Sequence, residues 1–299
     1  MKIYFLNYSD DRFNYKKRAF RQKQIALNES ARRHHIEHIV AWTWEDMAAT
    51  DFYRKNKAYL DKNRYHNGAV FKPYIILDLL ERMDAGDVVF YHDCGPHPIT
   101  RSIQPLVDLC LNNNGTVFHQ WGDRNRNWTK RDAFVYMDCD TPQYHNAVAL
   151  QNTWLLLQKS DLSLQFTREW LKYNLDERIA SYVMPDTCGL PPLRGFLENR
   201  GDQSIVSNLA VKYGIKTFFG QGEARNRDVN EFMRAMPKNA FYKAAWAYVR
   251  LKRKLKRRYK LATTGRDELC GVIPAEMRNF CYLTAETQAP DRPAAGSPS

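Results

Sequence analysis

Short apolar blocks alternate with longer amphipathic blocks along the first two-thirds of the chain. The apolar blocks have the length of strands, and the amphipathic blocks carry their apolar residues at helical spacing. This alternation predicts an α/β fold with a mostly parallel sheet flanked by helices. We expect strands at Ile3–Asn7 (placed at an edge of the sheet), Ile39–Trp44, Val88–Tyr91, Thr116–Trp121, Asn152–Gln158 and Ile215–Phe219. We expect helices at Tyr15–Ile36, Phe71–Met83, Ile103–Leu111, Ser160–Leu175 and Asp202–Val211, and a polar loop or short helix at Asp46–Asn63.

The composition is that of a folded protein. The chain has 299 residues, of which 44% are hydrophobic, enough for a sizeable core and too apolar for a disordered protein. No segment approaches the roughly 20 apolar residues that a membrane span requires, and the first residues resemble a strand rather than a signal peptide. None of the six cysteines forms a C-x-x-C pair, which disfavours a zinc or redox motif. We therefore expect a cytoplasmic protein.

The chain becomes strongly basic beyond about Gly222, and its net charge of +12 calls for an anionic partner. We expect an α/β domain at 1–222, a basic helical extension at 223–262, and a C-terminal segment at 263–299 that is disordered at its end. The extension has the pattern of an amphipathic helix on the anionic inner face of the cell membrane. A solvated helix or an RNA-binding segment is the alternative. The membrane-binding residues would be Trp246, Lys252, Arg253, Lys254, Lys256, Arg257 and Arg258.

The apolar run Gly86–Gly95 ends abruptly in an acidic residue, Asp93. The carboxyl ends of strands form the rim where open α/β sheets bind ligands. A carboxylate there can hold Mg²⁺ or Mn²⁺, and the cation can hold a diphosphate. Gly95, two positions on, would let the diphosphate approach the backbone. The alternative is an ordinary Asp that caps a loop.

A literal D-x-D pair occurs at Asp138 and Asp140. It follows a short predicted helix, for which we expect Thr129 as N-cap and Asp132 in the capping-box position. Acidic residues at a helix C-terminus oppose the helix dipole, so they need a reason to be there. A metal site is one reason, but we favour a turn through Asp140-Thr141-Pro142.

A third acidic residue, Asp202, lies at the start of a predicted helix, with Gln203 and Ser204 in its first turn. A helix N-terminus can receive an anion or a polar sugar. Asp202 could orient an attacking hydroxyl or take its proton, or it could simply be an N-cap.

Cationic and aromatic candidates are less specific. Basic residues near predicted helix starts can neutralise phosphate or be solvated surface charges, and these are Lys72, Lys130 and Arg131. Aromatic faces suit a uracil ring or a sugar, but also a core, and the candidates are Trp121, Trp128, Tyr144 and Trp154.

Several segments, taken in order, resemble bacterial nucleotide-sugar glycosyltransferases of polysaccharide and cell-surface glycan loci, which have a GT-A type of fold. The resemblance covers about Met1 to Phe219 and depends on the ordered set rather than on one motif. The segments are Phe71-Lys72-Pro73-Tyr74, Gly86–Gly95, Trp128-Thr129-Lys130-Arg131-Asp132-Ala133-Phe134, Glu169-Trp170-Leu171 and Asp202-Gln203-Ser204.

The resemblance implies a Rossmann-like domain that moves a sugar from a nucleoside-diphosphate sugar to a hydroxyl of a glycan or lipid-linked acceptor. It implies Asp93 as the ligand of a divalent metal, Asp202 as the catalytic residue, and Asp132 as part of the site wall. The implied donor-binding residues are Asp93, Gly95, Lys72, Lys130, Arg131 and Gln203.

This chain departs from the family pattern at two places. Gly95 stands where D-x-D has its second acid, which puts metal dependence in question. Asn199 and Gly201 stand where related sequences carry His. Two other functions remain open: a basic module that binds RNA or phospholipid without catalysis, and a metal-dependent nucleotidyltransferase. For the glycosyltransferase we expect no nucleic-acid partner.

Overall fold

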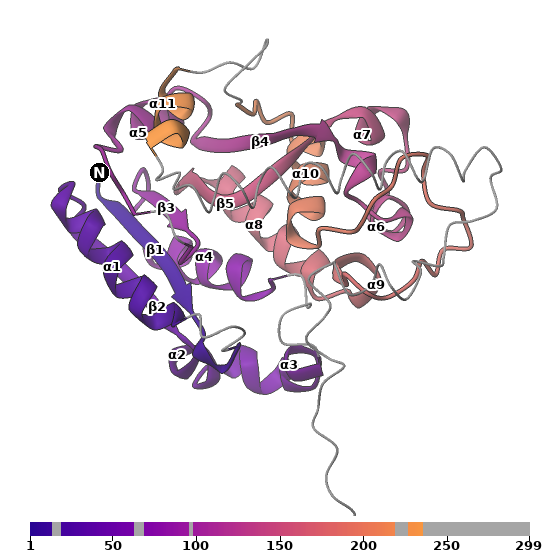
Figure 1. The fold of residues 1–299 in the computed structure, drawn as a ribbon, viewed down its shortest axis with the longest axis horizontal. Coiled ribbons are helices and arrows are strands. Elements are labelled where there is room, and N and C mark those ends of the chain that lie inside the picture. The colour runs from indigo at the N-terminus through magenta and orange to yellow at the C-terminus, as the bar shows by residue number, and fades with distance from the viewer. Residues whose placement is uncertain (14–18, 63–68, 96–97, 219–226, 236–299) are drawn as a thin grey trace, which may run out of the picture.

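The computed structural model describes residues 1–13, 19–62, 69–95, 98–218 and 227–235. In these residues the strands form one five-stranded sheet of order β2-β1-β3-β5-β4 (Figure 1). The predicted α/β fold with helices flanking a sheet is confirmed. The strands are β1 (Ile3–Ser9), β2 (His38–Thr43), β3 (Val88–His92), β4 (Thr116–Arg124) and β5 (Val148–Gln158).

Four of the five strands run in one direction. β1 pairs in parallel with β2 and β3, whereas β5 runs antiparallel to both β3 and β4. β4 therefore points the same way as β1, β2 and β3, and the sheet is mostly parallel with one reversed strand. The prediction that Ile3–Asn7 forms an edge is wrong, because β1 lies between β2 and β3. Its residues Phe5 and Leu6 are fully buried on opposite faces, as an inner strand requires.

Helices cover both faces of the sheet. α4 (Phe71–Arg82), α8 (Asp161–Asn174) and α10 (Asp202–Lys212) pack on one face, and α1 (Phe20–Arg33) and α5 (Gln104–Leu111) on the other. The remaining helical elements are η1 (Asp11–Phe13), α2 (Trp44–Ala48), α3 (Asp51–Lys62), η3 (Asn125–Asn127), α6 (Arg131–Tyr136), α7 (Pro142–Asn146), α9 (Glu177–Ala180) and α11 (Arg227–Ala235).

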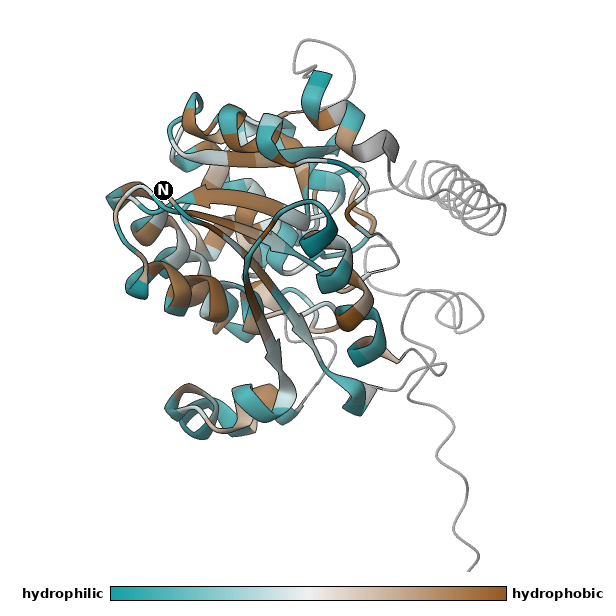
Figure 2. Cartoon of the chain, turned by 90° about the vertical axis from the view of Figure 1, so that its left-hand side faces the viewer, coloured by the Kyte–Doolittle hydropathy of each residue, from teal (hydrophilic) through white to brown (hydrophobic). Residues whose placement is uncertain are grey.

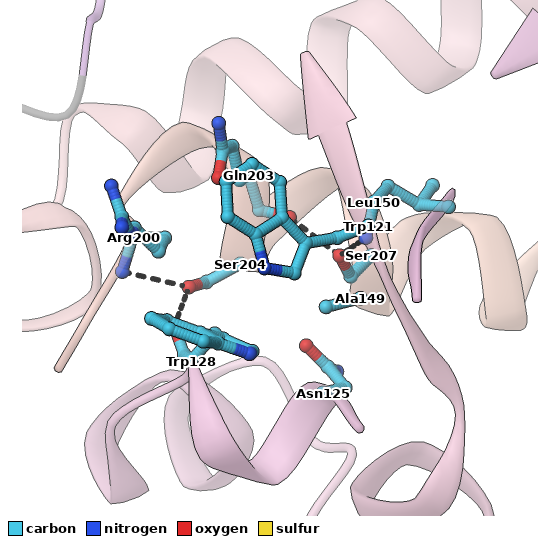
Figure 3. A pocket seen from close by; sticks show the side chains of 9 residues that line it. All are labelled: Trp121, Asn125, Trp128, Ala149, Leu150, Arg200, Gln203, Ser204 and Ser207. Carbon is cyan, nitrogen blue, oxygen red and sulfur yellow. Dashed lines mark hydrogen bonds between the residues drawn. The ribbon is translucent and has the colours of Figure 1, made fainter. Parts of the chain in front are cut away.

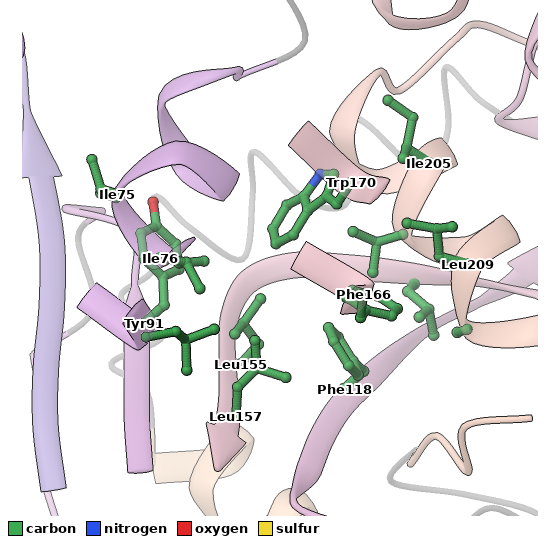
Figure 4. Packing of buried hydrophobic residues seen from close by; sticks show 14 of the residues in the cluster. Ile75, Ile76, Tyr91, Phe118, Leu155, Leu157, Phe166, Trp170, Ile205 and Leu209 are labelled. Carbon is green, nitrogen blue, oxygen red and sulfur yellow. The ribbon is translucent and has the colours of Figure 1, made fainter. Parts of the chain in front are cut away.

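Two hydrophobic clusters, one on each face of the sheet, form the core. Figure 4 shows the cluster beneath α4, α8 and α10, where Ile76, Tyr91, Leu155 and Trp170 meet across the strands. The strands between the helical layers are largely brown, that is hydrophobic, in Figure 2. This burial is the main stabilising contribution to the fold.

One predicted strand differs from the structure, and two predicted helical segments differ from it only in extent. Of the predicted strand Ile215–Phe219 the structure describes 215–218, where Phe218 forms an isolated bridge to His119 and no strand is present. The polar stretch Asp46–Asn63 is largely helical, as α2 and α3. The predicted helix Tyr15–Ile36 is observed as α1, although 14–18 lie outside the described residues.

The predicted capping of the short helix α6 is wrong. Lys130 is its N-cap, without a side-chain hydrogen bond. The Thr129 hydroxyl instead donates to Asn125 Oδ1 (2.7 Å). The Asp132 carboxylate accepts from the backbone N–H groups of Thr187 and Cys188 (2.8 Å each), so long-range contacts replace the local capping box.

The basic extension lies almost wholly outside the described residues, and so do Trp246 and the basic residues Lys252–Arg258. Its first helix, α11, packs Val229 and Phe232 into the cluster beside α5. Within the described part of the chain, no helix has the length and hydrophobicity needed to cross a bilayer. The expected domain boundary at 222 stays a prediction.

Candidate functional site

Two predicted site residues from distant parts of the chain, Asp93 and Asp202, meet at a third, Lys72. Lys72 Nζ lies 3.2 Å from Asp93 Oδ1 and 3.2 Å from Asp202 Oδ2. It also donates to the backbone oxygen of Asn152 (2.8 Å). An ammonium has three N–H donors, so these three protein acceptors account for all of them. We call Lys72, Asp93 and Asp202 the Lys72 cluster.

Strand and helix periodicity explain why these side chains meet. Asp93 directly follows β3 and lies two residues after Tyr91, which belongs to the face covered by α4, so both point to that face. The Tyr91 hydroxyl donates to Asp93 Oδ1 (2.6 Å). Lys72 lies three and four residues before the buried Ile75 and Ile76, on the side of α4 that faces the sheet.

A bulge in β5 supplies the third acceptor. The pairs Val117–Leu156 and His119–Gln151 leave more residues on β5 than on β4 between them. Asn152 lies in this bulge, where its carbonyl reaches Lys72 and its side-chain Nδ2 donates to the Asp202 carbonyl (3.2 Å). Bulges of this kind commonly redirect side chains beside functional sites.

A glycine allows Asp202 to begin its helix at this point. Gly201 is the N-cap of α10 and has a φ of 49°, a conformation that glycine adopts without strain. Asp202 is then the first helical residue, followed by Gln203 and Ser204 in the first turn, as predicted. The Tyr182 hydroxyl makes a long contact (3.4 Å) with Asp202 Oδ1.

The carboxylates of the cluster differ in exposure. The Asp93 side chain is 37% exposed, whereas those of Lys72 and Asp202 are 5% and 6% exposed. Both contacts made by Asp93 use Oδ1, so its carboxylate keeps an exposed face. Asp93 is therefore the member of the cluster that a ligand can reach.

Electrostatics keep Lys72 charged. Burial lowers its pKa, but the two carboxylates raise it more, so the pKa lies above its usual value. Burial raises the pKa of Asp202, and the negative charge of Asp93 adds to this effect, while Lys72 opposes it. With both carboxylates ionised, one positive and two negative charges leave the cluster anionic at its open side.

Two other predicted donor-binding cations have partners elsewhere. Lys130 Nζ lies 3.2 Å from Asp132 Oδ2 and donates to the carbonyl oxygen of Met184 (3.0 Å). Arg131 forms an ion pair with Asp140 (2.7 Å). The structure therefore does not bring these two cations together with the Lys72 cluster, and it gives both of them structural partners.

The literal D-x-D pair lies in a turn between α6 and α7, but this turn centres on Asp140 and does not run through Pro142, which begins α7. Asp138 has a φ of 54°, and the Thr141 N–H donates to the Cys139 carbonyl (2.8 Å). Asp140 is bound by Arg131 and by His145 (2.8 Å). The two acids thus have local roles after α6.

Gln203 lines a neighbouring pocket rather than the Lys72 cluster. The pocket is walled by Trp121, Trp128, Arg200 and the first turns of α10 (Figure 3). Of the aromatic candidates, Trp121 and Trp128 lie here, whereas Trp154 is fully buried in the core. Tyr144 packs at the edge of the core beneath α10.

Sequence reasoning missed three residues that contact the cluster, namely Tyr91, Asn152 and Tyr182. Of these, Tyr91 could have been found, because it lies two positions before Asp93 on the same strand. Asn152 gave no signal, since a bulge depends on how two strands pair rather than on local sequence.

Comparisons with known proteins give limited information. No protein-family model matches the chain, and no curated protein matches it in sequence. Among solved structures, the crystal structure of galactosyltransferase LgtC in complex with donor and acceptor sugar analogs is similar to it, with a TM-score of 0.37 and 16% identity. The match covers 93% of this chain and 99% of that chain. At this level of similarity, the match says nothing about the substrates of this chain.

Among the described members of the Lys72 cluster, Asp93 is the one that could hold a metal ion. In the described residues no group of three His, Cys, Asp or Glu side chains could hold a metal. Mg²⁺ often takes one or two carboxylates, several waters and the substrate phosphates. Asp93, with its exposed carboxylate, could be one such ligand among the described residues. Gly95 adds no side chain, and its N–H donates to the Asp93 carbonyl (2.7 Å).

Proposed function

We propose that the chain transfers a sugar from a nucleoside-diphosphate sugar to a hydroxyl of a glycan or lipid-linked acceptor in bacterial surface polysaccharide synthesis. The single observation that carries this proposal is the Lys72 cluster, in which an exposed carboxylate at the end of β3 is held by a buried lysine. The ordered motifs of the sequence, which resemble those of nucleotide-sugar glycosyltransferases, support it.

The position of Asp93 in the sheet also supports the proposal. From β1 the chain continues to β2 on one side, and β3 lies on the other side. Ligands of open α/β sheets bind beyond the carboxyl ends of strands at such a reversal of strand order. Asp93 lies at that end of β3, so a diphosphate bound between β1 and β3 would face its exposed carboxylate.

The leaving group in this reaction is a nucleoside diphosphate, and stabilising its developing charge is the main catalytic requirement. A divalent ion held by Asp93 would supply a Lewis acid for the diphosphate when bound. Lys72 holds the Asp93 carboxylate in place through Oδ1. Because its N–H donors are already used, we assign Lys72 to positioning rather than to direct phosphate binding.

Asp202 lies on the enclosed side of Lys72. The prediction that it orients or deprotonates the acceptor hydroxyl stays a prediction. Its raised pKa suits a base, because proton acceptance is most effective near the working pH. Its 6% exposure instead favours a positioning role through Lys72. If Asp202 is the base for the acceptor hydroxyl, Asp202→Asn should reduce transfer more than donor hydrolysis. If Asp202 only positions Lys72, the variant should reduce both rates equally.

A panel of nucleoside-diphosphate sugars tests the function directly. We expect release of nucleoside diphosphate from one donor, and loss of this release in Asp93→Asn. Thermal stabilisation by nucleoside triphosphates alone would favour the nucleotidyltransferase. No release from any donor, together with RNA or phospholipid binding that does not need Asp93, would favour the non-catalytic module.

Metal binding can be tested by measuring the melting temperature of the protein. Since Asp93 is the single acidic ligand that the cluster offers, we expect Mn²⁺ alone to leave the melting temperature unchanged. We expect Mn²⁺ together with the nucleoside diphosphate to raise it above the value with nucleotide alone. A clear shift with Mn²⁺ alone would indicate a preformed site and contradict this geometry.

Membrane association of the extension is a separate part of the proposal, supported by sequence alone. We expect binding to vesicles that contain anionic lipid and none to neutral phosphatidylcholine vesicles. Replacing the six basic residues of 252–258 by Gln should abolish vesicle binding and leave transfer to a water-soluble acceptor unchanged. Equal binding of both proteins would remove this part.

A further inference from the structure

Apolar side chains project from the connection between α9 and α10. Residues 182–196 of this connection, which we call the 182–196 loop, form no helix or strand. Figure 1 shows the connection extending past α6 before it returns to α10. Val183 is 46% and Leu190 is 43% exposed, and Pro185 and Pro191 are exposed as well. The other large exposed hydrophobic side chains of the described surface lie singly in other parts of the chain. A concentration of this kind indicates a contact surface.

Buried polar groups fasten the 182–196 loop to the rest of the protein. Lys130 Nζ donates to the carbonyl oxygen of Met184 (3.0 Å). The Asp132 carboxylate accepts from the N–H groups of Thr187 and Cys188 (2.8 Å each). The backbone of the loop thus forms its hydrogen bonds towards the protein, while apolar side chains are held outward. A partner that contacts them has little loop ordering to offset.

The charges of the loop favour an anionic surface. Its single acidic residue, Asp186, has a side chain that is 13% exposed and lies 4.0 Å from Lys130 Nζ, so this charge is balanced on the inner side. Its single basic residue, Arg194, is exposed. Apolar side chains beside an exposed cation suit the boundary between headgroups and acyl chains of an anionic bilayer. The prolines of the loop have no N–H group that would lose its water partner there.

A protein partner fits this surface less well. Interfaces between proteins depend on aromatic and arginine anchors that insert into pockets of the partner. The aromatic residues of the loop, Tyr182 and Phe196, are only partly exposed. Its most exposed apolar side chains are aliphatic or proline, which suit the disordered acyl chains of a lipid surface.

The loop also begins beside the Lys72 cluster, because the Tyr182 hydroxyl contacts Asp202 Oδ1 (3.4 Å). We propose that the 182–196 loop inserts into the interface of an anionic membrane, so that the site takes a lipid-linked acceptor rather than a free glycan. The inference rests on the proposed function, since it names the class of acceptor. A few aliphatic side chains bind a bilayer only weakly, so the loop acts together with the basic extension, as anchoring by two signals requires.

A tryptophan placed in the loop tests insertion in the full-length protein. Leu190→Trp is mixed with vesicles of phosphatidylglycerol and phosphatidylcholine, with and without bromine on the acyl chains. Bromine quenches tryptophans that contact it, so we expect more quenching in Leu190→Trp than in the wild type, which contains seven tryptophans. The matched control is Ile25→Trp, at a position that is 49% exposed on α1, and it should show no added quenching.

Kinetics test the choice of acceptor. With the donor found in the panel, dodecyl glycosides in the same vesicles are compared with methyl glycosides in solution. In the double variant Val183→Glu/Leu190→Glu, the apparent KM for a dodecyl glycoside should rise roughly tenfold, because charges oppose insertion. The KM for a methyl glycoside should stay within about twofold of wild type. The matched control Ile25→Glu/Leu111→Glu replaces exposed apolar residues of α1 and α5 and should change neither value. Melting curves establish that each variant is folded.

The outcomes separate the loop from the proposed function. No added quenching in Leu190→Trp overturns insertion while sugar transfer stands. Dimerisation in solution that Leu190→Glu abolishes also overturns it, because the surface would then bind a second copy of the chain. Equal use of methyl and dodecyl glycosides, or no transfer to any dodecyl glycoside, overturns the choice of acceptor. Failure of every nucleoside-diphosphate sugar overturns the proposed function, and added quenching at position 190 would then support membrane insertion alone.

Discussion

Two lysines of this molecule are similarly buried, but the aspartates that they contact differ greatly in exposure. The side chains of Lys72 and Lys130 are 5% and 3% exposed, and each ammonium lies 3.2 Å from an aspartate oxygen. Asp132, the partner of Lys130, is fully buried. Asp93, the partner of Lys72, is 37% exposed.

The difference lies in what the aspartates bind. Asp132 accepts hydrogen bonds from the backbone of Thr187 and Cys188, so the Lys130–Asp132 pair fastens the 184–188 loop to α6. Asp93 accepts from Tyr91 and Lys72 and keeps an exposed face. The first pair is closed and structural, and the second is open to a ligand. Exposure of the carboxylate, rather than the presence of a lysine, distinguishes the two.

The largest expected contrast is between Asp93→Asn and Asp132→Asn. We expect Asp93→Asn to lower the transfer rate by about 10²–10³-fold while the free energy of unfolding stays within about 1 kcal/mol of wild type. We expect Asp132→Asn to cost about 3–5 kcal/mol, because it leaves Lys130 buried with fewer acceptors. Rates per folded molecule and urea unfolding measure both. An active Asp93→Asn protein would remove the site.

A double-mutant comparison comes next in size. Lys72→Met should cost about 3 kcal/mol, since it leaves Asp93 and Asp202 without their cation. Adding Asp202→Asn should recover part of this loss, because the enclosed carboxylate has fewer other donors. Adding Asp132→Asn to Lys130→Met should recover less stability. In the Lys130→Met protein Asp132 still accepts hydrogen bonds from Thr187 and Cys188, so its charge is less costly. Urea unfolding of the wild type, the four single variants and the two double variants gives both coupling energies, and equal recoveries would contradict the distinction.

The two clusters should also respond oppositely to pH. Burial raises the pKa of Asp132, but hydrogen bonds from Cys188 and Thr187 lower it by a larger amount. The net effect is a pKa below the usual value. Its stabilising contribution is present above the unfolded pKa near 3.9 and is lost as the pH falls through the folded value. The pKa of Asp202 is raised. Its contribution is fully present below the unfolded pKa and is lost as the pH rises through the folded value.

Unfolding of wild type, Asp132→Asn and Asp202→Asn between about pH 3 and about pH 8 checks these signs. The cost of Asp132→Asn should shrink towards low pH. The stability of Asp202→Asn relative to wild type should improve towards high pH. Parallel curves for the two variants would show that both aspartates have similar environments, which the structure contradicts.

Local sequence predicted much of the fold and named each member of the Lys72 cluster as a candidate. The helix at Phe71, the strand ending before Asp93 and the helix beginning at Asp202 all follow from short-range periodicity and turn chemistry. Strand order and direction did not, because pairing partners are chosen by long-range burial; hence β1 was misplaced at an edge and the reversal of β5 was not foreseen. For the same reason, periodicity named Lys72 and Asp202 separately but not their ion pair.

The smallest expected effect concerns Arg131, for which sequence and structure lead to different expectations. The sequence predicts a donor-binding cation, whereas the structure pairs Arg131 with Asp140 in a contact that keeps 18% of its side chain exposed. Partly exposed pairs contribute about 0.2–1 kcal/mol, so Arg131→Ala should cost no more than this and leave the donor KM unchanged. A rise of tenfold or more in the donor KM, with normal stability, would instead show that Arg131 leaves Asp140 to bind phosphate. The closed region of the molecule would then take part in the chemistry of the open one.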